Sequence, residues 1–355
     1  MEKINRVLKG IGPLDRKVME SARQRQDRLT KPQKSLGVLE ELSIRVAGIM
    51  GDPLPEIEDK AIIIMVGDHG VVEEGVSAYP REVTGQMVYN FVEGGAGINV
   101  CATHVGARIV IVDAGIATDI VSPFVVNKKV RHGTDNITKG PAMSFNEAVQ
   151  SIEAGISVVE EEIEKGLDII GTGDMGIGNT TPSSALTAFI TGVDVRHVTG
   201  RGTGVNDSVY KKKIETIEKS LSINNPDPEN PVDVLAKLGG CEIGGICGVI
   251  LAGAAHKIPV VIDGFISGAA ALIAARMAPQ VKDYMISAHC SREIGHKIIL
   301  DWLGLTPLFN LDLCLGEGTG SALGVSLVDL SCKLLTNMST FADAGVCTAT
   351  EEVIS

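Results

Sequence analysis

A glycine-rich segment with one acid is a place where chemistry could occur. Residues 171–181 read GTGDMGIGNTT and directly follow the apolar run 167–170. Thr181 and Pro182 suit the N-cap and first position of a helix, so the segment is predicted to be a loop between a strand and a helix. Glycines let the backbone approach a ligand closely, and N–H groups at a helix start bind anions such as phosphate. Asp174 adds a carboxylate to this predicted loop.

A second acid is flanked by glycines near the end of the chain. Residues 316–320 read GEGTG and follow residues 311–315. A carboxylate in this setting is poorly explained as core or as ordinary surface, so Glu317 is predicted to face a ligand. Apolar neighbours such as Leu315 would raise its pKa and make it a better proton acceptor near neutral pH. A glycine-rich turn with an incidental acid is the alternative.

The elements that must position these residues are predicted from residue 60 onward. Short β-branched runs alternate there with helix-patterned stretches, which indicates parallel strands joined by helices. The predicted strands cover 61–66, 108–112, 167–170, 259–262 and 284–287. Ser144 and Glu147 form a capping box at the start of one predicted helix. The predicted fold class is α/β, with a Rossmann-like parallel sheet flanked by helices.

Polar or glycine residues follow every predicted strand. The five segments are GDHG at 67–70, DAG at 113–115, GTGDMGIG at 171–178, DGF at 263–265 and AHCS at 288–291. In an open parallel sheet the ligand crevice lies outside the carboxyl ends of the strands. We therefore expect all five segments to converge on one pocket, although any single segment alone is better explained as a turn.

Composition and charge exclude several classes of protein. The 355 residues carry a formal net charge of −12, which argues against nucleic-acid and anionic-membrane partners because those need clustered Lys and Arg. The apolar stretch 244–278 is interrupted by His256, Lys257 and Asp263, so no membrane span is expected. The histidines show no metal-ligand spacing, and no metal is expected. The N-terminus has no apolar signal segment and the seven cysteines include no CxxC pair, so a cytoplasmic location is expected.

Two other classes of function fit part of the sequence. The glycines of 171–176 match GxGxxG after a strand, and Asp194 has the spacing of a ribose-binding acid, as in an NAD-dependent oxidoreductase. Asp174 opposes this interpretation because its carboxylate would repel a pyrophosphate. A non-catalytic nucleotide sensor is the other alternative. Glu317 argues against a sensor, since a protein that only binds needs no base.

Long motifs spread over nearly the whole chain resemble one family. They are DRLTKPQKSLG at 27–37, GDHGVVEEGVSAYPREVTGQM at 67–87, GDMGIGNTT at 173–181, GRGTGV at 200–205, GGCEIGG at 239–245, DGFISGAAA at 263–271, SAHCSREIGH at 287–296 and LCLGEGTGSAL at 313–323. The chain resembles the nicotinate-nucleotide:dimethylbenzimidazole phosphoribosyltransferases, which make the lower-ligand nucleotide of cobamides.

The resemblance implies a fold, an assembly and a reaction. A Rossmann-like catalytic domain would cover 60–325, and a small helical domain would be built from 1–59 and 326–355. The implied assembly is a homodimer whose partner helps to complete each site, or a heterodimer with a paralogue. Nicotinate mononucleotide would give its 5-phosphoribosyl group to 5,6-dimethylbenzimidazole or a related base, with inversion at the anomeric carbon and without a cofactor. Phenolic or purine acceptors are the alternative, since related enzymes use them.

The resemblance also assigns roles to individual residues. Glu317 is expected to be the general base, and Asp174 occupies a second catalytic position where family members more usually have Glu. The residues expected to hold the phosphate and ribose are Gly176, Ile177, Gly178, Gly202, Lys213, Asp263 and Ser291. Those expected to line the acceptor pocket are Ala78, Tyr79, Gln86, Met175 and Leu315. Lys213 ends a run of three lysines that would otherwise be interpreted as a solvated helix face.

Overall fold

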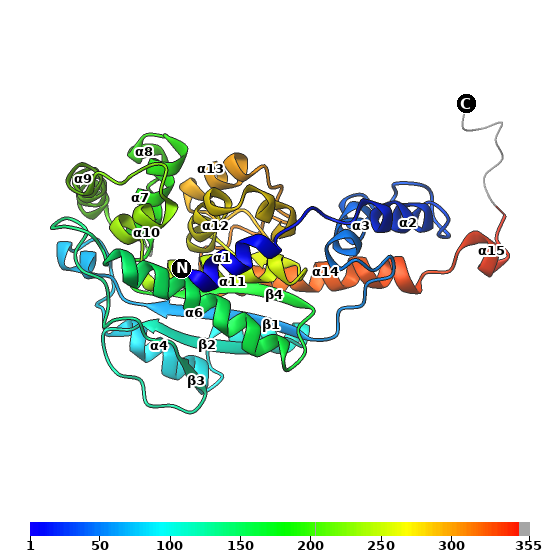
Figure 1. The fold of residues 1–355 in the computed structure, drawn as a ribbon, viewed down its shortest axis with the longest axis horizontal. Coiled ribbons are helices and arrows are strands. Elements are labelled where there is room, and N and C mark those ends of the chain that lie inside the picture. Colours follow the sequence, from blue (N-terminus) through cyan, green and yellow to red (C-terminus); the bar gives the residue numbers. More distant parts are fainter. Residues whose placement is uncertain (203, 348–355) are drawn as a thin grey trace. The chain divides into compact units, whose positions relative to one another are not determined.

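The computed structural model describes residues 1–202 and 204–347, which fall into two compact units (Figure 1). The larger unit contains residues 1–12 and 59–325, and the smaller one contains 13–58 and the chain from 326 onward. The sequence had assigned all of 1–59 to the smaller domain. Residues 1–12 belong instead to the larger unit, because α1 (Glu2–Gly10) packs on α6 and α11. The N-terminal amine lies 2.6 Å from the Glu153 carboxylate of α6.

The larger unit is built on a six-stranded, wholly parallel sheet with the strand order β3-β2-β1-β4-β5-β6. The strands are β1 (Lys60–Gly67), β2 (Arg108–Gly115), β3 (Val125–Asn127), β4 (Ile169–Met175), β5 (Val260–Ile262) and β6 (Met285–Ser287). This is the order of a doubly wound Rossmann-like sheet, so the predicted fold class is confirmed. The order reverses between β1 and β4, and such a point is where these folds bind ligands.

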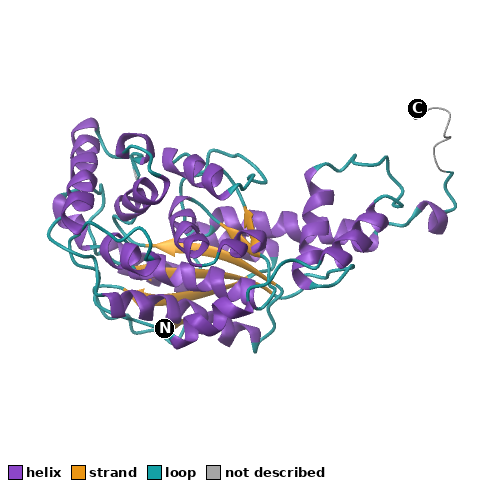
Figure 2. Ribbon diagram, turned by 45° about the horizontal axis from the view of Figure 1, so that its top comes forward, coloured by secondary structure: helices purple, strands orange, loops and turns teal. Residues whose placement is uncertain are grey.

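Helices cover both sides of this sheet (Figure 2). Besides α1, the described helices of the larger unit are α4 (Val83–Val92), α5 (Gly97–Val105), α6 (Phe145–Ile163), α7 (Thr180–Thr191), α8 (Val195–Val198), α9 (Asp207–Asn224), α10 (Pro231–Leu238), α11 (Cys241–Ala255), α12 (Phe265–Met277), α13 (Ile294–Leu303) and the start of α14 (Thr319–Asn337), with short 3-10 helices at Gly70–Glu74 and Pro279–Tyr284. The capping box predicted for α6 is confirmed, since Ser144 Oγ accepts from Glu147 N–H at 3.2 Å and the Glu147 carboxylate accepts from Ser144 N–H at 2.7 Å.

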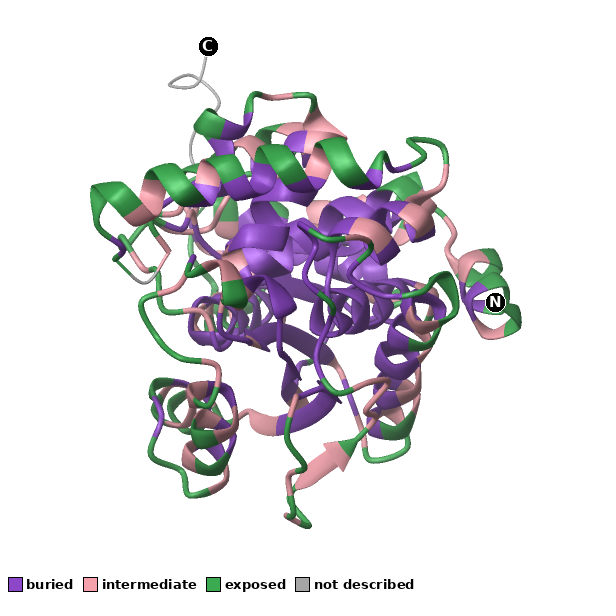
Figure 3. Cartoon of the chain, turned by 90° about the vertical axis from the view of Figure 1, so that its left-hand side faces the viewer, coloured by how far each residue is buried: buried purple, intermediate pink, exposed green. Residues whose placement is uncertain are grey.

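The side chains of β1 divide between the two covering layers, as the alternation of a strand requires. Met65 packs against Gly245 of α11, whereas Ile62 lies against Gly318 at the start of α14. The α11 helix in turn packs on α6, and a Cβ added at Gly155 of α6 would overlap the Gly245 carbonyl oxygen. The central strands β1 and β4 are thereby buried except at Lys60 and Met175, one terminal residue of each (Figure 3).

The smaller unit combines segments from both ends of the chain. It contains α2 (Arg16–Gln26), α3 (Val38–Met50), the later part of α14 and α15 (Phe341–Ala344). Its apolar core is Ala22, Ile44, Ala47 and Leu335. None of the helices in residues 1–202 and 204–347 combines the length and apolar character needed to cross a membrane.

The region around residues 171–181 differs from its predicted form. Residues 171–175 were expected to be a loop but continue β4, where they pair with β1 as far as Met175 and Val66. The glycine at 173 is required because α14 starts against the strand, and an added Cβ would lie 2.7 Å from the Glu317 carbonyl oxygen. The next helix begins at Thr180, so the prediction of Thr181 as N-cap is also wrong.

Candidate active site

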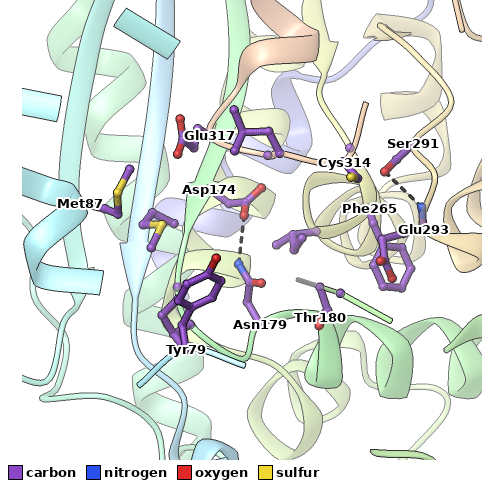
Figure 4. A pocket seen from close by; sticks show the side chains of 18 of the residues that line it. Tyr79, Met87, Asp174, Asn179, Thr180, Phe265, Ser291, Glu293, Cys314 and Glu317 are labelled. Atoms are coloured by element: carbon purple, nitrogen blue, oxygen red, sulfur yellow. Dashed lines mark hydrogen bonds between the residues drawn. The ribbon is translucent and has the colours of Figure 1, made fainter. Parts of the chain in front are cut away.

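A cavity of about 400 Å³ lies at the carboxyl ends of β4, β5 and β6 (Figure 4). Its lining comes from segments that are far apart in the sequence: Tyr79, Val83, Met87, Asp174, Met175, Gly176, Ile177, Asn179, Thr180, Gly202, Gly264, Phe265, Ile266, His289, Ser291, Glu293, Cys314, Leu315, Gly316 and Glu317. Part of the lining is apolar and part is glycine backbone, and three acids, Asp174, Glu293 and Glu317, belong to it.

Most residues predicted for the site line this single cavity. They are Tyr79, Asp174, Met175, Gly176, Ile177, Gly202, Ser291, Leu315 and Glu317. The predicted residues that do not line it are Ala78, Gln86, Gly178, Lys213 and Asp263. Ala78 and Gln86 are exposed, and α4 presents Val83 and Met87 to the cavity instead. Those two residues are spaced i and i+4, so they lie on one face of the helix.

Two of the five segments after strands do not reach the cavity, so the predicted convergence is wrong for them. Asp68, after β1, accepts a hydrogen bond from Ala117 N–H at 2.8 Å. Asp113, at the end of β2, accepts from Ile116 N–H at 3.0 Å and lies 3.2 Å from the Lys129 ammonium. The Asp113 carboxylate therefore stabilises its own turn, as the alternative interpretation had it, whereas the Asp68 carboxylate ties the end of β1 to the segment after β2.

Asp174 is the penultimate residue of β4 and is 5% exposed. Its Oδ2 accepts a hydrogen bond from Asn179 Nδ2 at 2.9 Å, and Oδ1 has no partner within the described chain. Burial raises the pKa of Asp174 well above its ordinary value, and the negative charges of Asp263 and Glu242 raise it further. Asn179 is thus held by Asp174, which explains why its side chain does not cap α7.

Glu317 lies in a backbone conformation that is unusual for a residue with a Cβ. Its φ is +63°, and it stands between Gly316 at +81° and Gly318 at +92°. The side chain is 6% exposed, and Oε2 makes no hydrogen bond to any residue that the structure describes. Burial raises the pKa of Glu317, which confirms the expected direction, while a hydrogen bond from Ile98 N–H at the start of α5 opposes it. Leu315, the neighbour expected to cause the shift, is largely exposed.

Lys213 lies behind the glycine-lined side of the cavity and is not itself part of the lining. The residue is 1% exposed within α9, and its Nζ donates to Thr180 Oγ1 at 2.6 Å. A Cβ added at Gly202 would lie 3.4 Å from the same Nζ, so the ammonium sits directly behind two lining residues. Burial lowers its pKa to about 8, with the Glu293 charge opposing. Lys211 and Lys212 are exposed, so the solvated-face interpretation holds for them only.

The rest of the glycine-lined side is fixed by local hydrogen bonds. Ile177 N–H donates to Thr84 Oγ1 at 3.1 Å, and Gly178, at φ +88°, turns the chain against Val72. Ser291 N–H donates to Nδ1 of His296 at 2.9 Å. That ring is buried, and burial lowers its pKa to about 3, so it is a neutral acceptor.

Several lining residues were missed by the sequence predictions. They are Val83, Met87, Asn179, Thr180, Gly264, Phe265, Ile266, His289, Glu293, Cys314 and Gly316. Asn179 and Thr180 follow the predicted glycine loop directly, and Phe265 and His289 lie in two of the segments after strands, so a signal existed for these. Within the described chain, no group of three or more His, Cys, Asp or Glu side chains could hold a metal ion.

Comparisons with known proteins agree with one another. A family model described as Phosphoribosyltransferase matches residues 11–346. The nicotinate-nucleotide–dimethylbenzimidazole phosphoribosyltransferase of Desulforudis audaxviator is 54% identical over 347 residues, covering 98% of each chain. The protein of that name from Dehalococcoides mccartyi strain CBDB1 is 50% identical over 98% of this chain and 99% of its own. The crystal structure of the enzyme of that name from Thermus thermophilus superposes with a TM-score of 0.90 at 41% identity, covering 95% of this chain and all of that one.

Proposed function

Because the chain belongs to the nicotinate-nucleotide–dimethylbenzimidazole phosphoribosyltransferase family, we propose that it moves the 5-phosphoribosyl group of nicotinate mononucleotide onto 5,6-dimethylbenzimidazole. The product is an α-ribazole phosphate-type nucleotide for the lower ligand of cobamides. One structural observation supports this activity independently of the family relationship. Glu317, whose buried carboxylate has one oxygen without a described partner, belongs to the lining of a cavity with apolar side chains on one side and glycine backbone on the other, behind which lies Lys213.

The reaction makes three demands on the protein. A ring nitrogen of the acceptor attacks the anomeric carbon, and the bond from that carbon to the pyridinium nitrogen breaks with its electron pair left on nicotinate. Nicotinate therefore departs as a neutral ring and needs no acid to protonate it. The protein must hold the two rings in line, stabilise positive charge at the anomeric carbon, and accept the proton that the acceptor loses.

Glu317 is proposed to accept that proton. Its raised pKa brings the carboxylate closer to the basicity that proton transfer near neutral pH requires. Asp174 is proposed to stabilise the cationic anomeric carbon. Its side chain is one methylene shorter than the Glu more usual in the family, and the hydrogen bond from Asn179 fixes one of its two oxygens.

The nucleotide is proposed to lie across the glycine side of the cavity. Gly176, Ile177, Gly202 and Ser291 would contact its phosphate and ribose, and Gly178 would shape the turn that supports them. Lys213 supplies a cation behind Thr180 and Gly202, which supports this assignment because the chain as a whole repels anions.

The acceptor is proposed to lie against the apolar side, which Tyr79, Val83, Met87, Met175 and Leu315 line. Apolar contacts discriminate by about 10- to 200-fold per methylene, so we expect several aromatic bases to be accepted. Ala78 and Gln86 would influence this pocket from its margin, since both are exposed and neither lines it.

A homodimer is proposed as the working assembly, with a heterodimer of two paralogues as the alternative. Tyr79 and Leu315 both line the cavity, yet they are 51% and 59% exposed. Large apolar side chains at the mouth of a site are commonly covered by a partner. A second copy that covers this side would also exclude water from the reaction.

The test is to incubate the purified protein with nicotinate mononucleotide and a panel of benzimidazoles, purines and phenols, and to identify products by mass spectrometry. We expect release of nicotinate and phosphoribosylation of dimethylbenzimidazole. Transfer to phenols alone would favour the alternative acceptor class. Binding of the nucleotide without transfer to any acceptor would contradict the proposed activity and favour a sensor.

A further inference from the structure

We propose that Asp263 is a positioning residue that holds the Glu317 turn in place, and that it does not contact the nucleotide. The sequence had grouped Asp263 with the nucleotide-binding residues because it follows β5. The structure places its side chain, 1% exposed, behind the cavity lining. The inference rests on the proposed function, since it concerns the geometry of the proposed base.

The turn that carries Glu317 needs an external constraint. Gly316, Glu317 and Gly318 all have positive φ, and for Glu317 this conformation is disfavoured by its own Cβ. Such a conformation persists only where the surrounding structure fixes it. A turn released from its contacts would relax toward ordinary φ values and carry the carboxylate away from the cavity.

Asp263 supplies that constraint through both of its oxygens. Oδ2 accepts from Gly318 N–H at 3.2 Å, and Oδ1 accepts from Ser321 N–H at 2.9 Å. These N–H groups belong to the start of α14, where the backbone has no partner within the helix. A carboxylate from another strand end thus caps this helix and fixes the residue that directly follows Glu317.

The backbone of Asp263 is also tied to β4. Asp263 N–H donates to Thr172 Oγ1 at 3.1 Å, and Ser321 Oγ donates to the Thr172 carbonyl oxygen at 2.8 Å, so β4, β5 and α14 are joined at one point. His289 Nε2 lies 3.9 Å from Asp263 Oδ1. Residue 320 must be glycine, because an added Cβ would lie 2.7 Å from that same oxygen.

Asp263 also acts on Glu317 through its charge. The Asp263 carboxylate raises the pKa of Glu317, in addition to the larger effect of burial. Glu317 must be deprotonated to accept a proton, so its pKa sets the acidic limb of the pH profile. Removal of the Asp263 charge would lower the pKa of Glu317 and move that limb to lower pH. A residue with a purely structural role would reduce activity without moving the limb.

The decisive variant is Asp263→Asn, which keeps the shape and removes the charge and part of the hydrogen bonding. We expect kcat to fall by up to about 100-fold, as misplacement of a reacting group by about 1 Å does. We expect the Kd of nicotinate mononucleotide, measured by calorimetry, to change by less than about 2-fold, and the acidic limb of kcat to move to lower pH. A Kd raised tenfold or more would return Asp263 to the nucleotide site and overturn the proposal.

Asp113→Asn is the matched control, because Asp113 is also a buried acid at a strand end that accepts a backbone N–H, yet it lies away from the cavity. In this variant, kcat per folded molecule and the acidic limb of the pH profile of kcat should not change. Amide hydrogen exchange of peptides covering 314–322 gives a readout that does not depend on activity. Exchange there should rise in Asp263→Asn and stay unchanged in Asp113→Asn.

Unchanged exchange together with unchanged kcat in Asp263→Asn would overturn the proposal. Thr172→Val provides a second test if Asp263→Asn does not fold, because it removes the hydroxyl that accepts from Asp263 N–H and leaves the carboxylate in place. We expect raised exchange in 314–322 from this variant too, and normal exchange there would count against the constraint. Failure of the wild-type protein to transfer phosphoribose would remove the proposed function, while the exchange measurements would still decide the positioning role.

Discussion

Two buried acids face one cavity, and their surroundings favour different tasks. Burial raises the pKa of both Asp174 and Glu317. Asp174 also lies among the negative charges of Asp263, Glu242 and Glu317, a setting that would favour a positive charge at the anomeric carbon, and its Oδ2 accepts a hydrogen bond from Asn179. Glu317 accepts one backbone hydrogen bond and keeps a buried oxygen without a described partner. Asp174 also keeps one oxygen without a described partner, so the two acids differ mainly in the charges around them. Glu317 has fewer negative neighbours, and a lone carboxylate with a raised pKa suits acceptance of a proton from the attacking ring.

Glu317→Gln should therefore reduce turnover and leave binding intact. The amide keeps the shape but cannot take a proton, and general-base catalysis contributes about 10²- to 10⁴-fold. We expect kcat with dimethylbenzimidazole to fall by a factor in that range while the Kd of nicotinate mononucleotide stays nearly constant. Asp174→Asn is the comparison. It should slow acceptors of every acidity alike, whereas Glu317→Gln should least affect acceptors that attack without losing a proton. Near-normal kcat in folded Glu317→Gln would transfer the role of base to Asp174.

Lys213 should make nucleotide binding dependent on pH in the alkaline range. Its pKa is lowered to about 8, so the free protein carries the ammonium below that pH and loses it as pH rises through it. The phosphate then loses its buried cation, and Kd should rise as the pH increases through about 8. Lys213→Met should weaken binding at neutral pH by about 10- to 150-fold and abolish the alkaline dependence. Calorimetric titration between pH 6 and 9.5 measures the Kd of the wild type and of Lys213→Met.

Lys212→Met is the control for this experiment, since Lys212 precedes Lys213 on the same helix but is exposed. Its affinity should equal that of the wild type at every pH. Binding by the wild type that does not vary across the alkaline range would place the phosphate away from Lys213.

The acids of the site could be predicted from their neighbours in the sequence. Residues that reach the cavity only through contacts between distant segments could not. Asp174 and Glu317 could be predicted because both lie in glycine-rich segments, GTGDMGIG and GEGTG. Glu293 could not, since its place in the lining depends on the turn that Ser291 begins. Gln86 was expected in the pocket, but the rotation of α4 presents Met87 instead, and no residue type near Gln86 signals that rotation.

At the scale of elements, glycine-rich sequence predicted loops, but several of these glycines lie inside strands and helices that pack closely. The glycines of β4 admit the start of α14, and those of α6 and α11 let two helix backbones meet. The alternation of strands and helices was predictable because β-branched runs are short and separated. The strand β3 was not, since none of its three residues is buried, whereas the equally short edge strand β6 is buried throughout.

Gly248→Ala should destabilise the protein, although alanine is favoured over glycine in a solvated helix by about 1 kcal/mol. Gly248 lies in α11, and an added Cβ would overlap the Ile152 carbonyl oxygen of α6. Overpacking of this kind costs about 1 to 3 kcal/mol, because the helices must separate. We expect thermal unfolding by circular dichroism to show a Tm lower by several degrees.

Gly140→Ala is the matched control, because an added Cβ at Gly140 would meet no atom within 4 Å. Its Tm should equal that of the wild type or exceed it slightly. An unchanged Tm in Gly248→Ala would mean that α6 and α11 are less tightly packed than the structure has them.

At the scale of the whole molecule, the chain's net charge opposes its proposed donor. The formal charge is −12, and nicotinate mononucleotide is a net anion because its phosphate and carboxylate outweigh the pyridinium charge. The long-range field should therefore slow encounter, while local contacts such as the buried Lys213 ammonium provide the attraction. The two contributions respond differently to salt, since screening acts mainly on exposed charges.

Raising the ionic strength from 0.01 to 0.15 M should thus increase kcat/KM for nicotinate mononucleotide. The Debye length falls from about 30 to about 8 Å over this range, so long-range repulsion is removed while the buried contact at Lys213 remains. We expect a rise of about 2- to 10-fold in initial-rate measurements at fixed pH. The KM of dimethylbenzimidazole, which is uncharged at pH 8, should not change and serves as the internal control. A fall in kcat/KM for the nucleotide with added salt would mean that exposed cations near the cavity steer the donor in spite of the acidic surface.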